Sequence, residues 1–135
     1  MIIYKLLYNH LLPGLFKVQN RAANRFIWVP ILGDVFRIKQ RTVNRLNLQR
    51  GSNVLVYSVG AGYELDFIVD RVGKEGSVVG VDFSEGMLKI AREKIQKNNW
   101  TNVKLILADV KEYDPVGHTF DATLSNFGYL DEKVL

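Results

Sequence analysis

Residues 54–62 read VLVYSVGAG, and this stretch decides the fold. Its four leading apolar residues predict a buried strand, and the two glycines at its end predict a tight turn into a helix. A second apolar strand, VVGVD at residues 78–82, ends on the carboxylate of Asp82. In a parallel sheet such a pair forms a nucleoside site, because glycine admits a ligand close to the backbone and the carboxylate accepts ribose hydroxyls. The sequence therefore predicts a domain that binds an adenosine-containing cofactor.

Two helices are predicted between the strands, because apolar residues recur there at helical spacing. The first ends at Gly73, a typical helix stop, and the second begins at Ser84, a good N-cap. The inner faces of the two helices comprise Leu65, Ile68, Val69 and Val72 in the first, and Leu88, Ala91 and Ile95 in the second.

Strands are predicted at residues 54–57, 77–81, 103–107 and 119–125. Strands that alternate with helices require right-handed crossovers, which place successive strands parallel in one sheet. The predicted fold class is therefore α/β, a Rossmann-like doubly wound parallel sheet of about four strands, preceded by N-terminal helices.

Residues 1–50 are predicted to form a helical arm or lid, and residues 51–135 an incomplete cofactor-binding domain. In the arm, apolar spacing predicts one helix near residues 2–12 and another over residues 34–48, with Asp34 as its N-cap. The inner face of the second helix is expected to hold Val35, Ile38, Thr42, Val43 and Leu46, and its outer face Arg37, Lys39, Arg41 and Arg45.

The chain has 135 residues, the length of one domain. Its composition excludes several kinds of functional site. It contains no cysteine, so disulfides and thiolate metal sites are excluded, and its two histidines, His10 and His118, lie too far apart to suggest a metal site. No stretch approaches the ~20 apolar residues of a membrane span, and the features of a secretion signal are missing. We expect a cytoplasmic protein without bound metal.

The charge is distributed unevenly between the two halves. Residues 1–50 carry nine Lys/Arg against Asp34 alone, whereas the remainder carries nine Lys/Arg against thirteen Asp/Glu. A basic arm is either a solvated helix face or a surface for an anionic membrane, and the aromatic residues within residues 1–30 keep peripheral membrane contact open. No nucleic-acid partner is expected.

The glycine turn differs from that of nicotinamide dinucleotide proteins. Those proteins use Gly-x-Gly-x-x-Gly, in which the third glycine permits close packing of the helix on the strand. Leu65 occupies the third position here. A nicotinamide cofactor is therefore disfavoured.

Three further motifs follow the glycine turn in order and carry a family resemblance. Residues 79–88 read VGVDFSEGML, residues 107–110 read LADV, and residues 120–128 read FDATLSNFG. Together with residues 54–62, they resemble the motifs of class I S-adenosylmethionine-dependent methyltransferases. The resemblance is strongest to the group that contains the ubiquinone and menaquinone C-methyltransferases and related small-molecule and lipid methyltransferases.

The resemblance implies S-adenosylmethionine as the cofactor and assigns roles to individual residues. The two glycines would let the backbone pass the methionine end of the cofactor, and Asp82 would accept the ribose hydroxyls. Phe83 and Met87 would pack on the adenine, Asp109 would accept its amino group, and Asn126 would lie near the departing methyl. Helix capping by Asp82, a core position for Met87 and a simple turn at Asp109 are the alternatives. No catalytic residue is assigned. The cofactor-contacting set implied in this way is Ser58, Gly60, Gly62, Asp82, Phe83, Met87, Asp109, Val110 and Asn126.

The first motif departs from the family pattern at two positions. Val56 stands where the resemblance expects an acid that holds the cofactor's amino group, and Ser58 stands where it expects a glycine. Valine accepts no hydrogen bond, and we hypothesise that Glu64 or Asp66, just beyond the turn, compensates. Serine is tolerated at position 58 if its φ is negative.

The chain ends soon after the fourth predicted strand, whereas members of the family continue with three more strands. We therefore expect a truncated domain whose fourth strand is an exposed edge open to self-association, with Phe120, Leu124 and Phe127 bare. The predicted function is a methyltransferase acting on a small molecule or a lipid such as a quinone, or the cofactor-binding half of one. The alternative is a non-catalytic cofactor-binding or interaction module.

Overall fold

The computed structural model describes residues 29–126. The helix expected near residues 2–12 and the side chain of Phe127 lie outside this range. The elements of the described range are α3 (Val29–Arg45), β1 (Asn53–Tyr57), α4 (Leu65–Val72), β2 (Ser77–Asp82), α5 (Glu85–Lys97), β3 (Val103–Leu107) and β4 (Ala122–Ser125).

The four strands form one parallel sheet in the order β3-β2-β1-β4. Val54 of β1 pairs in register with Val78 of β2 on one side and with Ala122 of β4 on the other. The chain moves outward from β1 through β2 to β3 and then returns to the opposite side of β1. This reversal creates a switch point between β1 and β4, and ligands of such sheets bind outside the carboxyl ends of the strands there. The predicted parallel α/β fold is confirmed.

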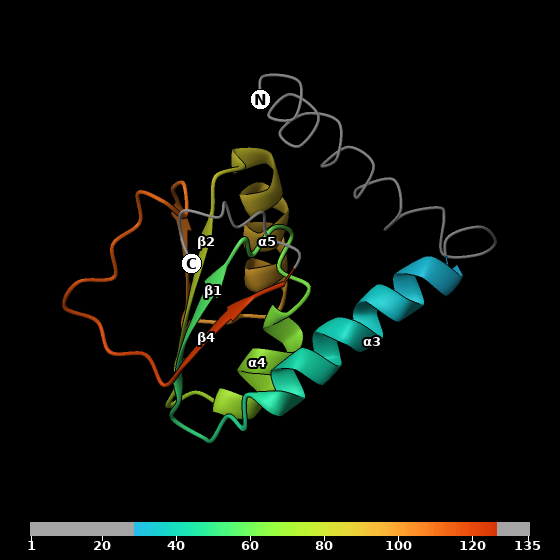
Figure 1. Cartoon of the computed structure of the whole chain (residues 1–135), viewed down its shortest axis with the longest axis horizontal. Helices are drawn as coiled ribbons and strands as arrows, with labels where there is room; N and C mark the ends of the chain where they lie inside the picture. Colours follow the sequence, from blue (N-terminus) through green and yellow to red (C-terminus); the bar gives the residue numbers. More distant parts are fainter. Residues whose placement is uncertain (1–28, 127–135) are drawn as a thin grey trace.

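Helices α4 and α5 pack on one face of the sheet, and α3 lies along α4 (Figure 1). The main core fills the space between these layers, and Val54 and Val56 supply its sheet side. The connection at residues 108–121 runs on the other side of the sheet and consists of turns without a helix (Figure 1). Its Tyr113 meets Tyr57 edge to face, with ring centroids 6.3 Å apart.

Local signals explain where α4 and α5 begin and end. Gly73 follows the last residue of α4 with a φ of 66°, and its N–H donates to the carbonyl of Val69. The side chain of Ser84 accepts a hydrogen bond from the Met87 N–H and caps α5. Both signals were predicted from the sequence, because a left-handed glycine and a serine N-cap satisfy backbone groups that a helix leaves open.

Helix α3 differs from the prediction at its start and on its inner face. It begins at Val29, before the predicted cap Asp34, and Pro30 lies in its first turn, where the missing N–H of proline costs no hydrogen bond. Val43 is fully buried as expected, but Ile38 is 45% exposed. Lys39 instead turns inward, and its side chain is 11% exposed.

The fourth strand is shorter and better covered than predicted. It begins at Ala122 rather than at residue 119, because Asp121 exchanges two hydrogen bonds with Asn53 at the amino end of β1: one from its own N–H (2.8 Å) and one accepted by its carboxylate (2.7 Å). Leu124 is 4% exposed and belongs to the core, so the expectation of a bare side chain was wrong there. Phe120 is half-buried and stacks on His118.

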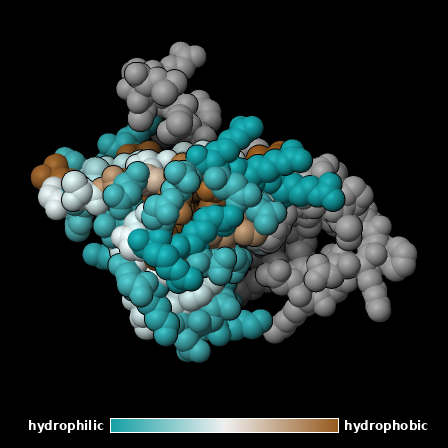
Figure 2. All heavy atoms as spheres, turned by 90° about the horizontal axis from the view of Figure 1, so that it is seen from below, coloured by the Kyte–Doolittle hydropathy of each residue, from teal (hydrophilic) through white to brown (hydrophobic). Residues whose placement is uncertain are grey.

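The amino ends of the strands form a mostly hydrophilic end of the molecule (Figure 2). An open hollow of about 390 Å³ is found there, lined by residues 46–52 and Asp121. This hollow lies at the edge of the sheet opposite to the one where parallel sheets bind ligands, so we do not assign the cofactor to it. Within residues 29–126, no helix has both the length and the apolar character needed to cross a membrane.

Candidate functional site

The carboxylate of Asp82 forms the centre of the carboxyl edge. Its Oδ2 accepts a hydrogen bond from the Gly60 N–H at 2.8 Å, and its Oδ1 accepts one from the Ser84 N–H at 2.9 Å. The residue is 1% exposed. Asp82 therefore joins the glycine turn after β1 to the start of α5, and the two sequence motifs meet at one carboxylate. A carboxylate offers about four acceptor sites in all, so Asp82 keeps capacity for a ligand hydroxyl.

Burial raises the pKa of Asp82 above its usual value of 3.8, although backbone hydrogen bonds from Ser84, Gly60 and Phe83 act in the opposite direction. Burial disfavours the charged carboxylate, whereas hydrogen bonds from N–H groups favour it. The site thus holds a desolvated acid whose charge is stabilised by fixed backbone donors.

This shift predicts a specific pH dependence of stability. Folded Asp82 keeps its proton to higher pH than the unfolded residue, so the folded chain binds more protons between the two pKa values. We expect the free energy of unfolding to fall, through this group, as the pH rises from about 3.8 through the folded pKa. Urea unfolding at several pH values checks this, because Asp82→Asn should remove that part of the slope. Parallel wild-type and variant profiles would contradict it.

The glycine turn is held in left-handed backbone conformations. Gly60 and Gly62 have φ values of 55° and 74°. A Cβ on Gly62 would lie 2.7 Å from Cδ1 of Leu65 and 3.3 Å from Cβ of Ala91, so this glycine also permits the turn to pack against α5. Both glycines predicted from the motif are therefore required by the backbone, whatever ligand approaches them.

Ser58 does not meet the condition set for it. Its φ is 53°, although a negative value was needed for a serine to be tolerated at the position of the expected glycine. A left-handed conformation costs a non-glycine residue about 1–2 kcal/mol because Cβ approaches the following carbonyl. The turn therefore carries backbone strain at its first position.

We expect Ser58→Gly to raise the free energy of unfolding by about 0.5–1 kcal/mol. Relief of the left-handed strain exceeds the extra entropy that glycine loses on folding. Asn99→Gly is the matched control, since Asn99 has the same φ of 53° but asparagine tolerates it better. Denaturant unfolding measures both, and a serine-to-glycine gain no larger than that of the control would contradict the account.

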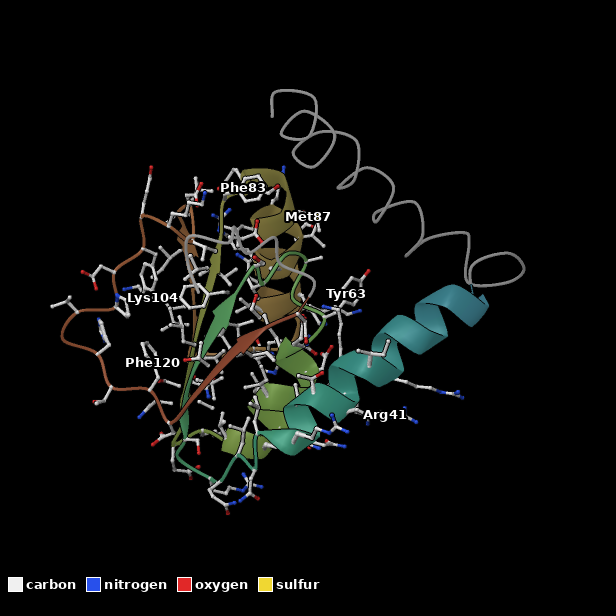
Figure 3. All side chains as sticks on the ribbon, viewed as in Figure 1. Arg41, Tyr63, Phe83, Met87, Lys104 and Phe120 are labelled. Carbon is white, nitrogen blue, oxygen red and sulfur yellow. The ribbon has the colours of Figure 1, made fainter. Side chains whose placement is uncertain are left out.

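The predicted adenine contacts lie at the start of α5. Phe83 follows the last residue of β2 and is half-buried, while Met87 lies in the first turn of α5 (Figure 3). Met87 is 4% exposed and packs with Ala61 and Ile90 in a small core cluster. The burial of Met87 favours the core alternative, and adenine contact by Phe83 stays a prediction.

Asp109 and Val110 follow β3 at the same edge. The Ala108 N–H donates to the Asp82 carbonyl at 3.0 Å, which extends the pairing of the strands and brings this segment next to the end of β2. Asp109 is exposed, and its Oδ1 accepts a hydrogen bond from the Lys111 N–H. The turn predicted as the alternative for Asp109 is thus present, and the exposed carboxylate keeps capacity for an amino group.

The end of β4 completes the edge next to the glycine turn. Ser125 pairs in register with Tyr57, so Asn126 lies level with the start of the turn. Ser125 Oγ and Asn126 Nδ2 are buried without a hydrogen-bond partner in the described part of the chain. Buried polar atoms are normally satisfied, so this corner has unused capacity for a polar ligand.

Residues 54–135, more than half of the chain, match a family model described as a methyltransferase domain. The chain belongs to the methyltransferase family. Curated relatives of this methyltransferase domain include demethylmenaquinone methyltransferases of Listeria welshimeri, 34% identical over 90 residues, and Geobacillus kaustophilus, 32% identical over 90 residues. The aligned part is 67% of this chain but 38% of each relative, so the chain spans well under half of their length.

Solved structures share the fold. The magnesium protoporphyrin IX methyltransferase of Synechocystis PCC 6803, solved with bound S-adenosylmethionine, matches with a TM-score of 0.70 and 17% identity, over 92% of this chain and 59% of that one. An S-adenosylmethionine-dependent O-methyltransferase of Thermotoga maritima matches with a TM-score of 0.60 and 20% identity, over 66% of this chain and 34% of that one. At these identities the likeness shows the methyltransferase fold.

The methyltransferase domain departs from the family pattern inside its core. Val56 is 1% exposed and packs in the main core, so an apolar side chain fills the position of the expected acid. Of the two acids proposed to compensate, Asp66 pairs with Lys94, which also donates to the Gly62 carbonyl at 3.0 Å. Glu64 is the other, and it is 1% exposed.

Sequence reasoning missed the partner of Glu64. Lys39 of α3 donates to Glu64 Oε1, so an ion pair with little exposure joins α3 to the residue at the start of α4. A signal for it was present in the sequence, because Lys39, Val43 and Leu46 recur at i, i+4 and i+7 and share one helix face. Within the described residues, no group of three or more histidines or acids is arranged to hold a metal ion.

Proposed function

We propose that this chain binds S-adenosylmethionine at the carboxyl edge of β1, β2 and β4 and is the cofactor-binding half of a methyltransferase. The observation that carries the proposal is the buried Asp82 carboxylate, which joins Gly60 to Ser84 where parallel sheets receive nucleosides. Membership of the methyltransferase family supports it.

The residues of the edge fit the parts of this cofactor. Asp82 would accept the ribose hydroxyls, Phe83 would pack on the adenine, and Asp109 would accept the adenine amino group. Asn126 would line the region of the departing methyl. The cofactor supplies a methyl group already activated by its sulfonium, so the task of the chain is to align sulfur, methyl and acceptor. The transfer from sulfur itself needs no acid–base residue, but an acceptor that must lose a proton, such as a quinol, also needs a general base, and we assign that role to no residue of the described range.

The acceptor we propose is a small molecule or a lipid such as a quinone. The names of the curated relatives support a quinone, and the basic, aromatic-rich sequence of residues 1–30 suits a cytoplasmic enzyme that meets an anionic membrane at its surface. Self-association through β4, an edge strand of the described sheet, is a further proposal.

A second candidate is a cofactor-binding module without turnover. Val56 favours it, because a buried valine at the position of the expected acid removes one acceptor from the cofactor site. This candidate predicts binding of the cofactor without methyl transfer to a reduced, demethylated quinone (a quinol), whereas an active methyltransferase would show both.

Calorimetric titration of the wild-type chain tests the proposal. We expect S-adenosylhomocysteine to bind with a micromolar dissociation constant, about −8 kcal/mol, and NADH to give no heat of binding. A folded chain that does not bind S-adenosylhomocysteine, or that binds NADH as tightly, would overturn the assignment of S-adenosylmethionine as the cofactor.

A further inference from the structure

Three polar side-chain atoms in the described part of the chain are buried without a hydrogen-bond partner: Glu64 Oε2, Ser125 Oγ and Asn126 Nδ2. All three belong to segments at the carboxyl edge beside the switch point. Ser125 ends β4 level with Tyr57, and Glu64 follows the glycine turn and precedes α4 (Figure 1). The unused hydrogen-bonding capacity therefore belongs to segments at the carboxyl edge of the sheet.

Of these three groups, the Glu64 carboxylate costs the most free energy when it is left without a partner. It is 1% exposed, and Lys39 satisfies Oε1 only. A charged oxygen that is buried and unpaired costs more than a neutral one, because it has lost its water and gained no donor. The group that best relieves this cost is a cationic donor, and an ammonium forms a charge-assisted hydrogen bond to a carboxylate.

We propose that Glu64 Oε2 receives the α-ammonium of the cofactor's methionine moiety while Lys39 holds Oε1. This inference rests on the proposed function. Glu64 lies two residues beyond Gly62, and the terminal torsion of a glutamate is soft enough to turn Oε2 toward the glycine turn. Glu64 thereby supplies the charge that the buried Val56 does not.

Asp66 is the other carboxylate beside the turn and is less suited to this role. Its side chain is 41% exposed and is engaged by Lys94, the residue that also binds the Gly62 carbonyl. An exposed carboxylate has water as its partner and gains little from an ammonium. Asp66 therefore provides a matched control on the same turn.

The test compares two ligands that differ in the amino-acid group. S-Adenosylhomocysteine carries the ammonium, and 5′-methylthioadenosine keeps the adenosine and the thioether but has no amino-acid part. Glu64→Gln is expected to weaken S-adenosylhomocysteine binding about 10- to 100-fold and to change 5′-methylthioadenosine binding less than about twofold. Asp66→Asn should change neither. Retained 5′-methylthioadenosine binding also reports that the variant is folded.

A second variant keeps the test decisive if Glu64→Gln is unstable. Lys39→Met/Glu64→Gln contains no unpaired buried charge and is expected to show the same selective loss. Equal weakening of both ligands, or of neither, would overturn the role of Glu64 and leave the proposed function standing. A folded wild-type chain that binds neither ligand would instead overturn the proposed function, and this inference with it.

Discussion

Asp82→Ala is expected to weaken S-adenosylhomocysteine binding by about 100-fold or more. The substitution removes the proposed acceptor of two ribose hydroxyls and releases the N–H groups of Gly60 and Ser84, which fix the shape of the turn. Hydrogen bonds to a charged group contribute about 1.5–3 kcal/mol each, so the loss of two accounts for this effect. Calorimetric titration of both chains measures it.

Asp121→Ala is the matched control for Asp82→Ala. Its carboxylate also accepts a backbone hydrogen bond, from Asn53 at 2.7 Å, but at the amino edge of the sheet. We expect both variants to lose stability in urea, and only the Asp82 variant to lose affinity. A folded Asp82→Ala chain that binds within about threefold of wild type would contradict the assignment of Asp82 to the cofactor site.

Lys39→Met is expected to lower the free energy of unfolding by about 3–5 kcal/mol. The variant leaves the Glu64 carboxylate, 1% exposed, without its cation, and removing one partner of a buried ion pair strands an uncompensated charge. This is a large fraction of the 5–15 kcal/mol that typically stabilises a domain. Urea unfolding followed by circular dichroism provides the measurement.

Two further variants separate charge burial from simple loss of contact. Lys94→Met breaks the more exposed Lys94–Asp66 pair and the hydrogen bond to the Gly62 carbonyl, and should cost about 1–2 kcal/mol, less than Lys39→Met. Lys39→Met/Glu64→Gln removes both charges and should recover most of the stability lost in Lys39→Met. A Lys39→Met cost as small as that of Lys94→Met would show that the Lys39–Glu64 pair does not anchor α3.

The sheet and its edge were predictable because their signals are local and strong. Apolar runs predicted β1 and β2. Gly73 predicted the end of α4, and Ser84 predicted the start of α5. Parallel strands bring their carboxyl ends to one edge, so the meeting of Gly60 with Asp82 followed from the chain order alone. The hydrogen bond between these two residues confirms that reasoning.

The errors came from interactions that depend on tertiary packing. Amphipathic periodicity assigns charged residues to the outer face of a helix, so Lys39 was predicted to point outward. It points inward instead, because it pairs with the buried Glu64 carboxylate just before α4. Leu124 was expected bare because helices beyond the fourth strand were expected to cover its face of the sheet. It instead packs in the core between the sheet and the described helices. The positive φ of Ser58 is set by the shape of the folded turn, so it could not be predicted from the residue types alone.

Titration of the ¹⁵N-labelled wild-type chain with S-adenosylhomocysteine tests most directly whether the cofactor binds at the carboxyl edge. We predict that the amide signals of Gly60, Gly62, Phe83 and Asp109 shift together and saturate with one dissociation constant. Shifts confined to residues 46–52, which line the hollow at the amino edge, would contradict this account. A folded chain whose spectrum does not change would contradict it equally.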